Sequence, residues 1–261
     1  MEKRIAQGLE ALGLDVRVPQ YAAGALARYG QELLEQNKVM NLTAIREEDG
    51  VARLHMLDCA ALLTVPGLDF SQKTLIDVGT GAGFPGLVLK ILAPSLEVTL
   101  LDSLQKRLDW LGNTAQVLEL EGVHTLHARA EEAAHLPEYR EMFDFATARA
   151  VADLRVLSEL CLPYVKVGGL FLAMKSVDSA AELEDANRTI QALGGAAETL
   201  WDYTIPGTGV THRIIAVRKL SPTPETYPRK WGKLRKGPRP GAQLQKSPSL
   251  KKITGDRRKS G

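Results

Sequence analysis

The sequence predicts an α/β fold in which a mostly parallel, seven-stranded sheet ends in an antiparallel hairpin. Residues 73–220 alternate short apolar runs with helical patterns, as expected of a Rossmann-like, doubly wound sheet. Glycine and proline residues separate these runs. The last two runs are joined by only six residues, 206–211, which are too few for a helical crossover. The strands formed by these two runs should therefore be antiparallel neighbours.

The chain divides into three parts by pattern. Residues 1–70 show only helical periodicity and predict an N-terminal helical part, and residues 71–220 form the α/β core. The predicted strands of the core are 74–79, 97–102, 123–129, 143–150, 170–176, 197–205 and 212–220. Helices are expected over 84–93, 104–122, 153–165 and 178–194. Residues 221–261 are rich in proline and cations without apolar periodicity, and predict a basic, mostly disordered tail.

Composition excludes several classes of protein. The 261 residues are 44% hydrophobic and 25% charged, which is ordinary for a soluble globular chain. Cys59 and Cys161 stand far apart, which excludes a disulfide scaffold and fits a reducing compartment. No apolar run is long enough for a membrane span, and charged residues interrupt the start of the chain, so no secretory signal is expected. We therefore expect a cytoplasmic protein, and nothing in the sequence implies an oligomer.

Charge is distributed unevenly along the chain. Residues 221–261 carry 12 Lys and Arg against 2 Asp and Glu, a net charge of +10, which leaves −8 for residues 1–220 of a chain whose net charge is +2. A basic arm on an acidic body suggests a polyanionic partner such as nucleic acid. A solvated tail that only improves solubility is an equally good interpretation of the charge alone.

The strongest motif is the segment LIDVGTGAGFPG at 75–86, where a strand, a glycine turn and a helix follow in order. Gly79, Gly81 and Gly83 allow the backbone to approach a ligand closely. The glycine spacing also fits a dinucleotide-dependent oxidoreductase. Asp77 inside the strand and the terminal hairpin favour S-adenosylmethionine instead, and so indicate the class I methyltransferase fold.

Two acidic positions follow the next strands. Asp102 ends the second strand about 20 residues after the turn, where a carboxylate can accept both ribose hydroxyls of a nucleoside. Asp102 can also cap the following helix, and both roles can hold together. Ala130 and Glu131 follow the third strand, beside the adenine pocket of this topology, although the acidic residues there could equally start a solvated helix.

The fourth strand is informative for the motifs that it lacks. No Asn/Asp-Pro-Pro-aromatic loop follows it, so methylation of an exocyclic amine is not supported. Cys161 lies on the apolar face of a predicted helix and is expected to be a core residue rather than a nucleophile. Arg149 stands at the catalytic edge instead. This pattern suits methylation of guanine N7, whose lone pair needs no general base. No pair of the five histidines has the spacing of a zinc site, so no metal is expected.

Several segments together resemble the RsmG (GidB) family of bacterial 16S ribosomal RNA guanine-N7 methyltransferases. The segments are 41–43, 53–58, 77–86, 101–103, 106–107, 148–150 and 223–230, and the resemblance covers roughly residues 30–235. It implies S-adenosylmethionine as methyl donor and, as partner and target, 16S ribosomal RNA or the small subunit, with a guanine in the loop near the decoding centre.

The resemblance also implies roles for single residues. It places Gly79, Phe84, Ala130, Glu131 and Arg149 in the cofactor site, with Arg149 in a positioning role. From the N-terminal helical part, Asn41, His55 and Asp58 become candidates for the substrate pocket. His55 and Asp58 stand three positions apart on one helical face, so they can act as a unit or simply form a packing hydrogen bond.

Two features depart from the family pattern. The last strand begins His212-Arg213, in the order opposite to many members, and strand alternation should aim the two side chains to opposite faces. This makes a substrate role for either residue doubtful. The tail beyond residue 230 is also longer than expected. An oxidoreductase, or a non-catalytic RNA-binding protein whose tail supplies affinity, remain the alternatives.

Overall fold

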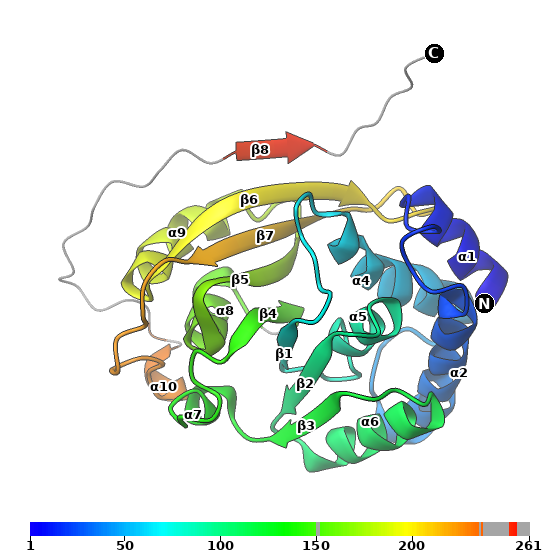
Figure 1. The fold of residues 1–261 in the computed structure, drawn as a ribbon, viewed down its shortest axis with the longest axis horizontal. Helices are drawn as coiled ribbons and strands as arrows, with labels where there is room; N and C mark the ends of the chain where they lie inside the picture. The colour runs from blue at the N-terminus through cyan, green and yellow to red at the C-terminus, as the bar shows by residue number, and fades with distance from the viewer. Residues whose placement is uncertain (150–151, 235, 237–250, 255–261) are drawn as a thin grey trace.

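A mixed sheet runs through the centre of the computed structural model, which describes residues 1–149, 152–234, 236 and 251–254 (Figure 1). In these residues the strands are β1 (Thr74–Val78), β2 (Glu97–Asp102), β3 (Val123–His127), β4 (Phe143–Arg149), β5 (Val165–Ser176), β6 (Gly195–Thr204), β7 (Thr211–Lys219) and β8 (Lys251–Thr254). Their order is β3-β2-β1-β4-β5-β7-β6-β8. The first five are parallel, and β7 is antiparallel to β5 and β6. The predicted parallel sheet with a terminal hairpin is confirmed.

Helices cover both faces of the sheet, because successive side chains of a buried strand point to opposite sides. In β1, Leu75 enters one apolar cluster and Ile76 enters the other. The N-terminal helices, α5 (Gly86–Leu92) and α6 (Gln105–Val117) pack around the first cluster. The second cluster contains residues of α7 (Ala130–Ala133), α8 (Leu154–Cys161), the 3-10 turn η3 (Leu162–Tyr164) and α9 (Ala180–Ala192).

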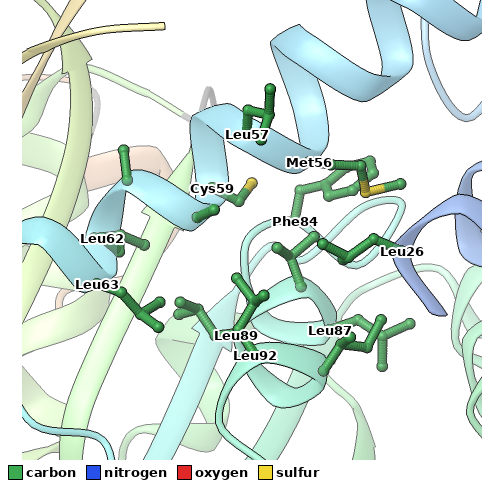
Figure 2. Packing of buried hydrophobic residues seen from close by; sticks show 14 of the residues in the cluster. Leu26, Met56, Leu57, Cys59, Leu62, Leu63, Phe84, Leu87, Leu89 and Leu92 are labelled. Atoms are coloured by element: carbon green, nitrogen blue, oxygen red, sulfur yellow. The ribbon is translucent and has the colours of Figure 1, made fainter. Parts of the chain in front are cut away.

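The N-terminal helical part shares the first of these clusters with the α/β core. It consists of α1 (Glu2–Ala11), α2 (Ala22–Met40), α3 (Glu48–Gly50), a π-helix η1 (Val51–Leu57), α4 (Asp58–Ala60) and a 3-10 turn η2 (Ala61–Thr64). Figure 2 shows apolar side chains of these helices, such as Met56 and Leu62, facing Phe84, Leu87 and Leu89. Because the two parts share buried surface, the core holds the N-terminal helices over the glycine turn.

Two predicted boundaries between 153 and 176 are wrong. Helix α8 ends at Cys161 instead of continuing to 165, because Pro163 lacks the N–H that a longer helix needs. Strand β5 begins at Val165 rather than at 170 and includes Gly168 and Gly169. A Cβ on Gly169 would lie 2.5 Å from the Asp144 carbonyl oxygen, so the strand can pass β4 only with glycine there.

The expectation of a disordered tail is wrong for residues 221–234. Arg140 donates hydrogen bonds to the carbonyl oxygens of Thr223 and Tyr227, at 2.8 and 3.0 Å. The short helix α10 (Trp231–Leu234) ends at Leu234, which is fully buried in the second cluster. Residues 251–254 form β8, which pairs in parallel with β6. Apart from residue 236, the rest of the predicted tail lies outside the described residues.

In the part of the chain that the structure describes, no helix has both the length and the apolar character needed to cross a bilayer.

Candidate active site

A cleft of about 810 Å³ opens where β1, β2, β3 and β4 end. Ligands of parallel α/β sheets bind beyond the carboxyl ends of the strands, so this is the expected position for a site. Of the predicted site residues, Gly79, Gly81, Phe84, Asp102, Ala130, Glu131, Arg149, His55 and Asp58 line the cleft. The fold therefore brings together residues that are up to 94 positions apart in the sequence.

The glycine turn forms the floor of the cleft. Gly79 and Gly81 have φ angles of 70° and 59°, which residues with a Cβ rarely adopt. The backbone N–H groups of Gly79 and Thr80 donate to the carbonyl oxygen of Leu101, at 2.9 and 3.0 Å, and so fix the turn to the end of β2. Among the described residues, a Cβ on Gly81 would meet only the Gly79 carbonyl oxygen, at 3.9 Å, so the positive φ angle rather than a lack of space favours glycine there.

Asp77 lies beneath this turn rather than in the cleft wall. The Asp77 Oδ2 atom accepts hydrogen bonds from the Thr80 hydroxyl at 2.7 Å and the Gly86 N–H at 2.9 Å. The buried Oδ1 atom has no hydrogen-bond partner among the described residues. Burial raises the pKa of Asp77 to about 6. The turn lies between this half-satisfied carboxyl group and the cleft, so the charge of Asp77, rather than a direct contact, can favour a cationic group in the cleft.

Asp102 ties three elements together at the end of β2. Its Oδ2 atom accepts from the Gly81 N–H at 3.0 Å, and its Oδ1 atom accepts from the Leu104 N–H at 2.9 Å, next to the start of α6. Arg107 lies 3.4 Å from Oδ2. The predicted capping of α6 by Asp102 is wrong, because the N-cap is Leu104 and Asp102 accepts from the backbone N–H of that residue rather than from the first turn of the helix. A carboxylate has about four lone-pair positions, so Asp102 can still accept from a ligand.

The third strand leads to the far end of the cleft. Ala130 begins α7, and its carbonyl oxygen accepts a hydrogen bond of 2.6 Å from the Tyr164 hydroxyl. Glu131 is buried against this end of the cleft. Trp231 of α10 lines the same cleft, a contribution that the expectation of a disordered tail could not foresee.

Arg149 joins the end of β4 to the covering N-terminal helices. One guanidinium nitrogen, Nη1, donates to the Leu54 carbonyl oxygen at 2.9 Å and to Asp58 Oδ2 at 3.1 Å. The other, Nη2, lies 2.9 Å from His55 Nδ1, and the guanidinium carbon stands 4.9 Å from the centre of the Phe84 ring. His55 and Asp58, which were expected to act as a unit, thus both contact the guanidinium group of Arg149. They do so although residues 51–57 form a π-helix rather than the expected α-helix.

His55 is held as a neutral ring. Its Nδ1 atom faces the Arg149 cation and must accept, so its Nε2 atom donates to the Thr43 hydroxyl at 2.8 Å. Burial and the positive charge of Arg149 lower the pKa of His55 to about 3. The ring also stacks on Phe84, with centroids 4.5 Å apart.

Asp58 is held as a carboxylate by polar partners on the hairpin. The Asp58 Oδ1 atom accepts from the Tyr203 hydroxyl at 2.7 Å and lies 2.8 Å from His212 Nδ1. Hydrogen bonds from His212 and Tyr203 and the charge of Arg149 lower the pKa of Asp58 despite its burial. The hydrogen bond to Asp58 raises the pKa of His212 in turn.

The predicted alternation of the last strand is present. His212 lines the cleft, whereas Arg213 turns away and pairs with Asp202 of β6, with Nε 2.6 Å from Oδ1. Sequence reasoning missed the contact between His212 and Asp58, because no local pattern links positions 154 residues apart.

Three predicted residues act next to the cleft without lining it. Asp77 lies below the turn, as described. A Cβ on Gly83 would collide with the Tyr29 hydroxyl and Leu111, so Gly83 allows α2 and α6 to approach the turn. Asn41 ends α2 with a φ of 50°, and it is the next residues, Leu42 and Thr43, that reach the cleft. Thr43 belongs to the same segment, 41–43, as Asn41, and this shared segment is the sequence signal that could have identified Thr43 as a site residue.

The matching family and the curated relatives agree with each other. Residues 23–204 match the family described as GidB: rRNA small subunit methyltransferase G. The chain is 43% identical over 230 residues to the ribosomal RNA small subunit methyltransferase G of Clostridium perfringens (strain SM101 / Type A), which covers 88% of this chain and 95% of that protein. It is 44% identical to the protein of the same name from Alkaliphilus oremlandii, over 87% of this chain and 95% of that protein. Among solved structures, a mutant of MtNAS has a similar fold, with a TM-score of 0.51 and 15% identity over 83% of this chain and 78% of that one.

Proposed function

Because the chain belongs to the GidB family of rRNA small subunit methyltransferases G, we propose that it transfers a methyl group from S-adenosylmethionine to N7 of a guanine in 16S rRNA. The target guanine would lie in the loop near the decoding centre, and the substrate would be the RNA or a small-subunit particle. This activity would place the protein in the cytoplasm. The observation that carries the proposal is the joint presence, in one cleft, of the glycine turn and the Asp102 carboxylate.

The cleft fits the proposed methyl donor. The buried, half-satisfied carboxylate of Asp77 below the turn suits a ligand that brings an ammonium group. Asp102 would accept the ribose hydroxyls, and Ala130 and Glu131 would border the adenine. Gly79, Gly81 and Phe84 line the stretch between these groups, and Gly83 lets the turn pack closely. When bound, the donor supplies an electrophilic methyl group on a sulfonium ion.

The charge state of the cleft supports a reaction without a general base. His55 already accepts a hydrogen bond from Arg149, and its pKa of about 3 makes it a very weak base. Both oxygens of Asp58 are engaged by Arg149, Tyr203 and His212. Guanine N7 carries a lone pair and no proton, so alignment with the methyl group is the main requirement.

Arg149 supports alignment in this proposal. Its contacts to Leu54, His55 and Asp58 fix the covering helices to β4, and these three residues line the cleft. His55 and Asp58 would then shape the pocket for the target guanine. Asn41 would act indirectly, by positioning Leu42 and Thr43 at the rim.

A transfer assay with radiolabelled S-adenosylmethionine tests the proposal. We expect label to enter 16S rRNA or small subunits and not 23S rRNA. A thermal-shift measurement separates this function from that of an oxidoreductase: S-adenosylhomocysteine should raise the melting temperature, and NAD or NADP should not. Stabilisation by a nicotinamide nucleotide with no transfer of label would refute the proposal.

A further inference from the structure

Trp231 stands where two cavities meet. It lines the main cleft and also a second cavity of about 620 Å³, and Arg129 and Glu131 line both cavities as well. Trp231 is 38% exposed, so part of its surface is open to a ligand. Trp231 therefore sits beside the part of the cleft that Ala130 and Glu131 form, after the end of β3.

Contacts on both sides of Trp231 fix its position. Before it, Arg229 forms a paired contact with the fully buried carboxylate of Glu159, with Nη2 2.7 Å from Oε2 and Nε 2.9 Å from Oε1. After it, the Leu234 carbonyl oxygen accepts from Arg155 at 2.9 Å. His135 Nε2 also lies 2.9 Å from the Pro228 carbonyl oxygen. These contacts anchor the backbone on both sides of Trp231, so less chain ordering is needed when this half-exposed aromatic residue meets a ligand.

We propose that Trp231 is a nucleobase-recognition residue whose indole packs on the adenine of the methyl donor. The inference rests on the proposed function and adds residues 228–234 to the donor site. Indole and adenine are both flat and uncharged, and base–aromatic stacking is favourable in partly exposed sites. The buried carboxylate of Glu131 on the same wall is an acceptor for an amino group such as that of adenine.

The charges around Trp231 favour the donor over an RNA strand. Glu131 and Glu132 line the second cavity together with Arg129 and Lys230, so the wall is not uniformly cationic. A groove that follows an RNA backbone is positively charged along its length. Trp231 also lines the same cleft as Asp102, the proposed ribose acceptor.

Calorimetric titration of S-adenosylhomocysteine into full-length protein tests the assignment. Trp231→Ala should weaken binding about tenfold, within the roughly 5- to 150-fold range typical of one base stack, and Trp231→Phe should restore most of it. Affinity for 5′-methylthioadenosine should fall by the same factor, because both ligands carry adenine. Trp201→Phe is the matched control, since Trp201 donates to Thr64 and does not line the cleft.

Tryptophan fluorescence gives an independent readout. S-adenosylhomocysteine should quench the emission of wild-type protein and of Trp201→Phe, and the quench should be lost in Trp231→Phe. Unchanged affinity and quenching in the Trp231 variants would overturn the assignment while leaving the methyltransferase intact. A change confined to RNA affinity would assign Trp231 to RNA and also overturn it. Failure of wild-type protein to bind the donor analogue would refute the proposed function itself.

Discussion

Asp77 has an unusual ionisation for a carboxyl group. Burial raises its pKa from 3.8 to about 6. The hydrogen bonds from Thr80 and Gly86 lower the pKa but do not offset the burial. The folded state then binds a proton more tightly than the unfolded state does. The contribution of Asp77 to stability is therefore full below about pH 4 and is lost as pH rises through about 6.

The first prediction compares wild-type protein with Asp77→Asn. Without ligand, the free energy of unfolding of wild-type protein should fall by about 2 kcal/mol relative to the variant between pH 4 and pH 7, since one pKa unit corresponds to about 1.4 kcal/mol. Urea denaturation at several pH values measures this difference. A difference that stays constant with pH would contradict the raised pKa of Asp77.

Asp102 carries the second prediction. Asp102→Asn keeps the size of the side chain but removes an acceptor, and it should weaken S-adenosylhomocysteine binding by about 1–3 kcal/mol in calorimetry. Asp109→Asn in the exposed part of α6 is the matched control and should bind normally. Equal donor affinity in the two variants would remove Asp102 from the ribose site.

At the scale of elements, the sequence predicted what depends on local pattern. The apolar runs at 74–79 and 97–102 and the short connection at 206–211 were sufficient for the parallel sheet and its hairpin. Contacts between distant elements could not be predicted in this way. The meeting of Asp58 with His212 depends on how the N-terminal helices sit on β7, and neither segment encodes that alone.

The C-terminal segment shows the same limit more clearly. Residues 221–234 have the proline-rich, basic composition of a disordered tail, but Arg229 finds the buried Glu159 and Leu234 finds an apolar site. Glu159 lies 70 positions from Arg229, and the Leu234 carbonyl oxygen accepts from Arg155, 79 positions away. The composition of the segment alone predicts disorder, whereas the ordered conformation depends on those partners in the core.

The third prediction tests this packing with Glu159→Gln. Removing one partner of a buried ion pair leaves the other charge uncompensated, so we expect a loss of about 3–5 kcal/mol in the free energy of unfolding. The exposed pair of Arg218 and Glu198 is the matched control, and Glu198→Gln should cost under about 1 kcal/mol. Equal costs in chemical denaturation would mean that residues 221–234 are not held by Glu159.

At the scale of the whole molecule, the basic charge is concentrated near the C-terminal end of the sequence. Seven cations and one acid lie after residue 236. A truncation after residue 236 therefore removes positive charge while keeping the packed segment that contains Trp231. We propose that the removed residues bind RNA phosphates without base preference.

The fourth prediction is that this truncation flattens the salt dependence of RNA affinity. Each lost phosphate contact should reduce the slope of log affinity against log salt by roughly 0.7–0.9. Donor affinity should not change. Identical slopes in full-length and truncated protein would show that the residues after 236 do not contact RNA.

The central claim, methyl transfer to guanine N7, is tested most directly by the chemistry of the product. RNA modified by the protein with S-adenosylmethionine should break at one guanine of 16S rRNA after borohydride reduction and aniline treatment, because N7-methylguanine alone among methylated guanines makes the strand cleavable in this way. RNA incubated without the donor should stay intact at that position. Methylated RNA that resists cleavage would contradict both the target atom and a mechanism without a general base.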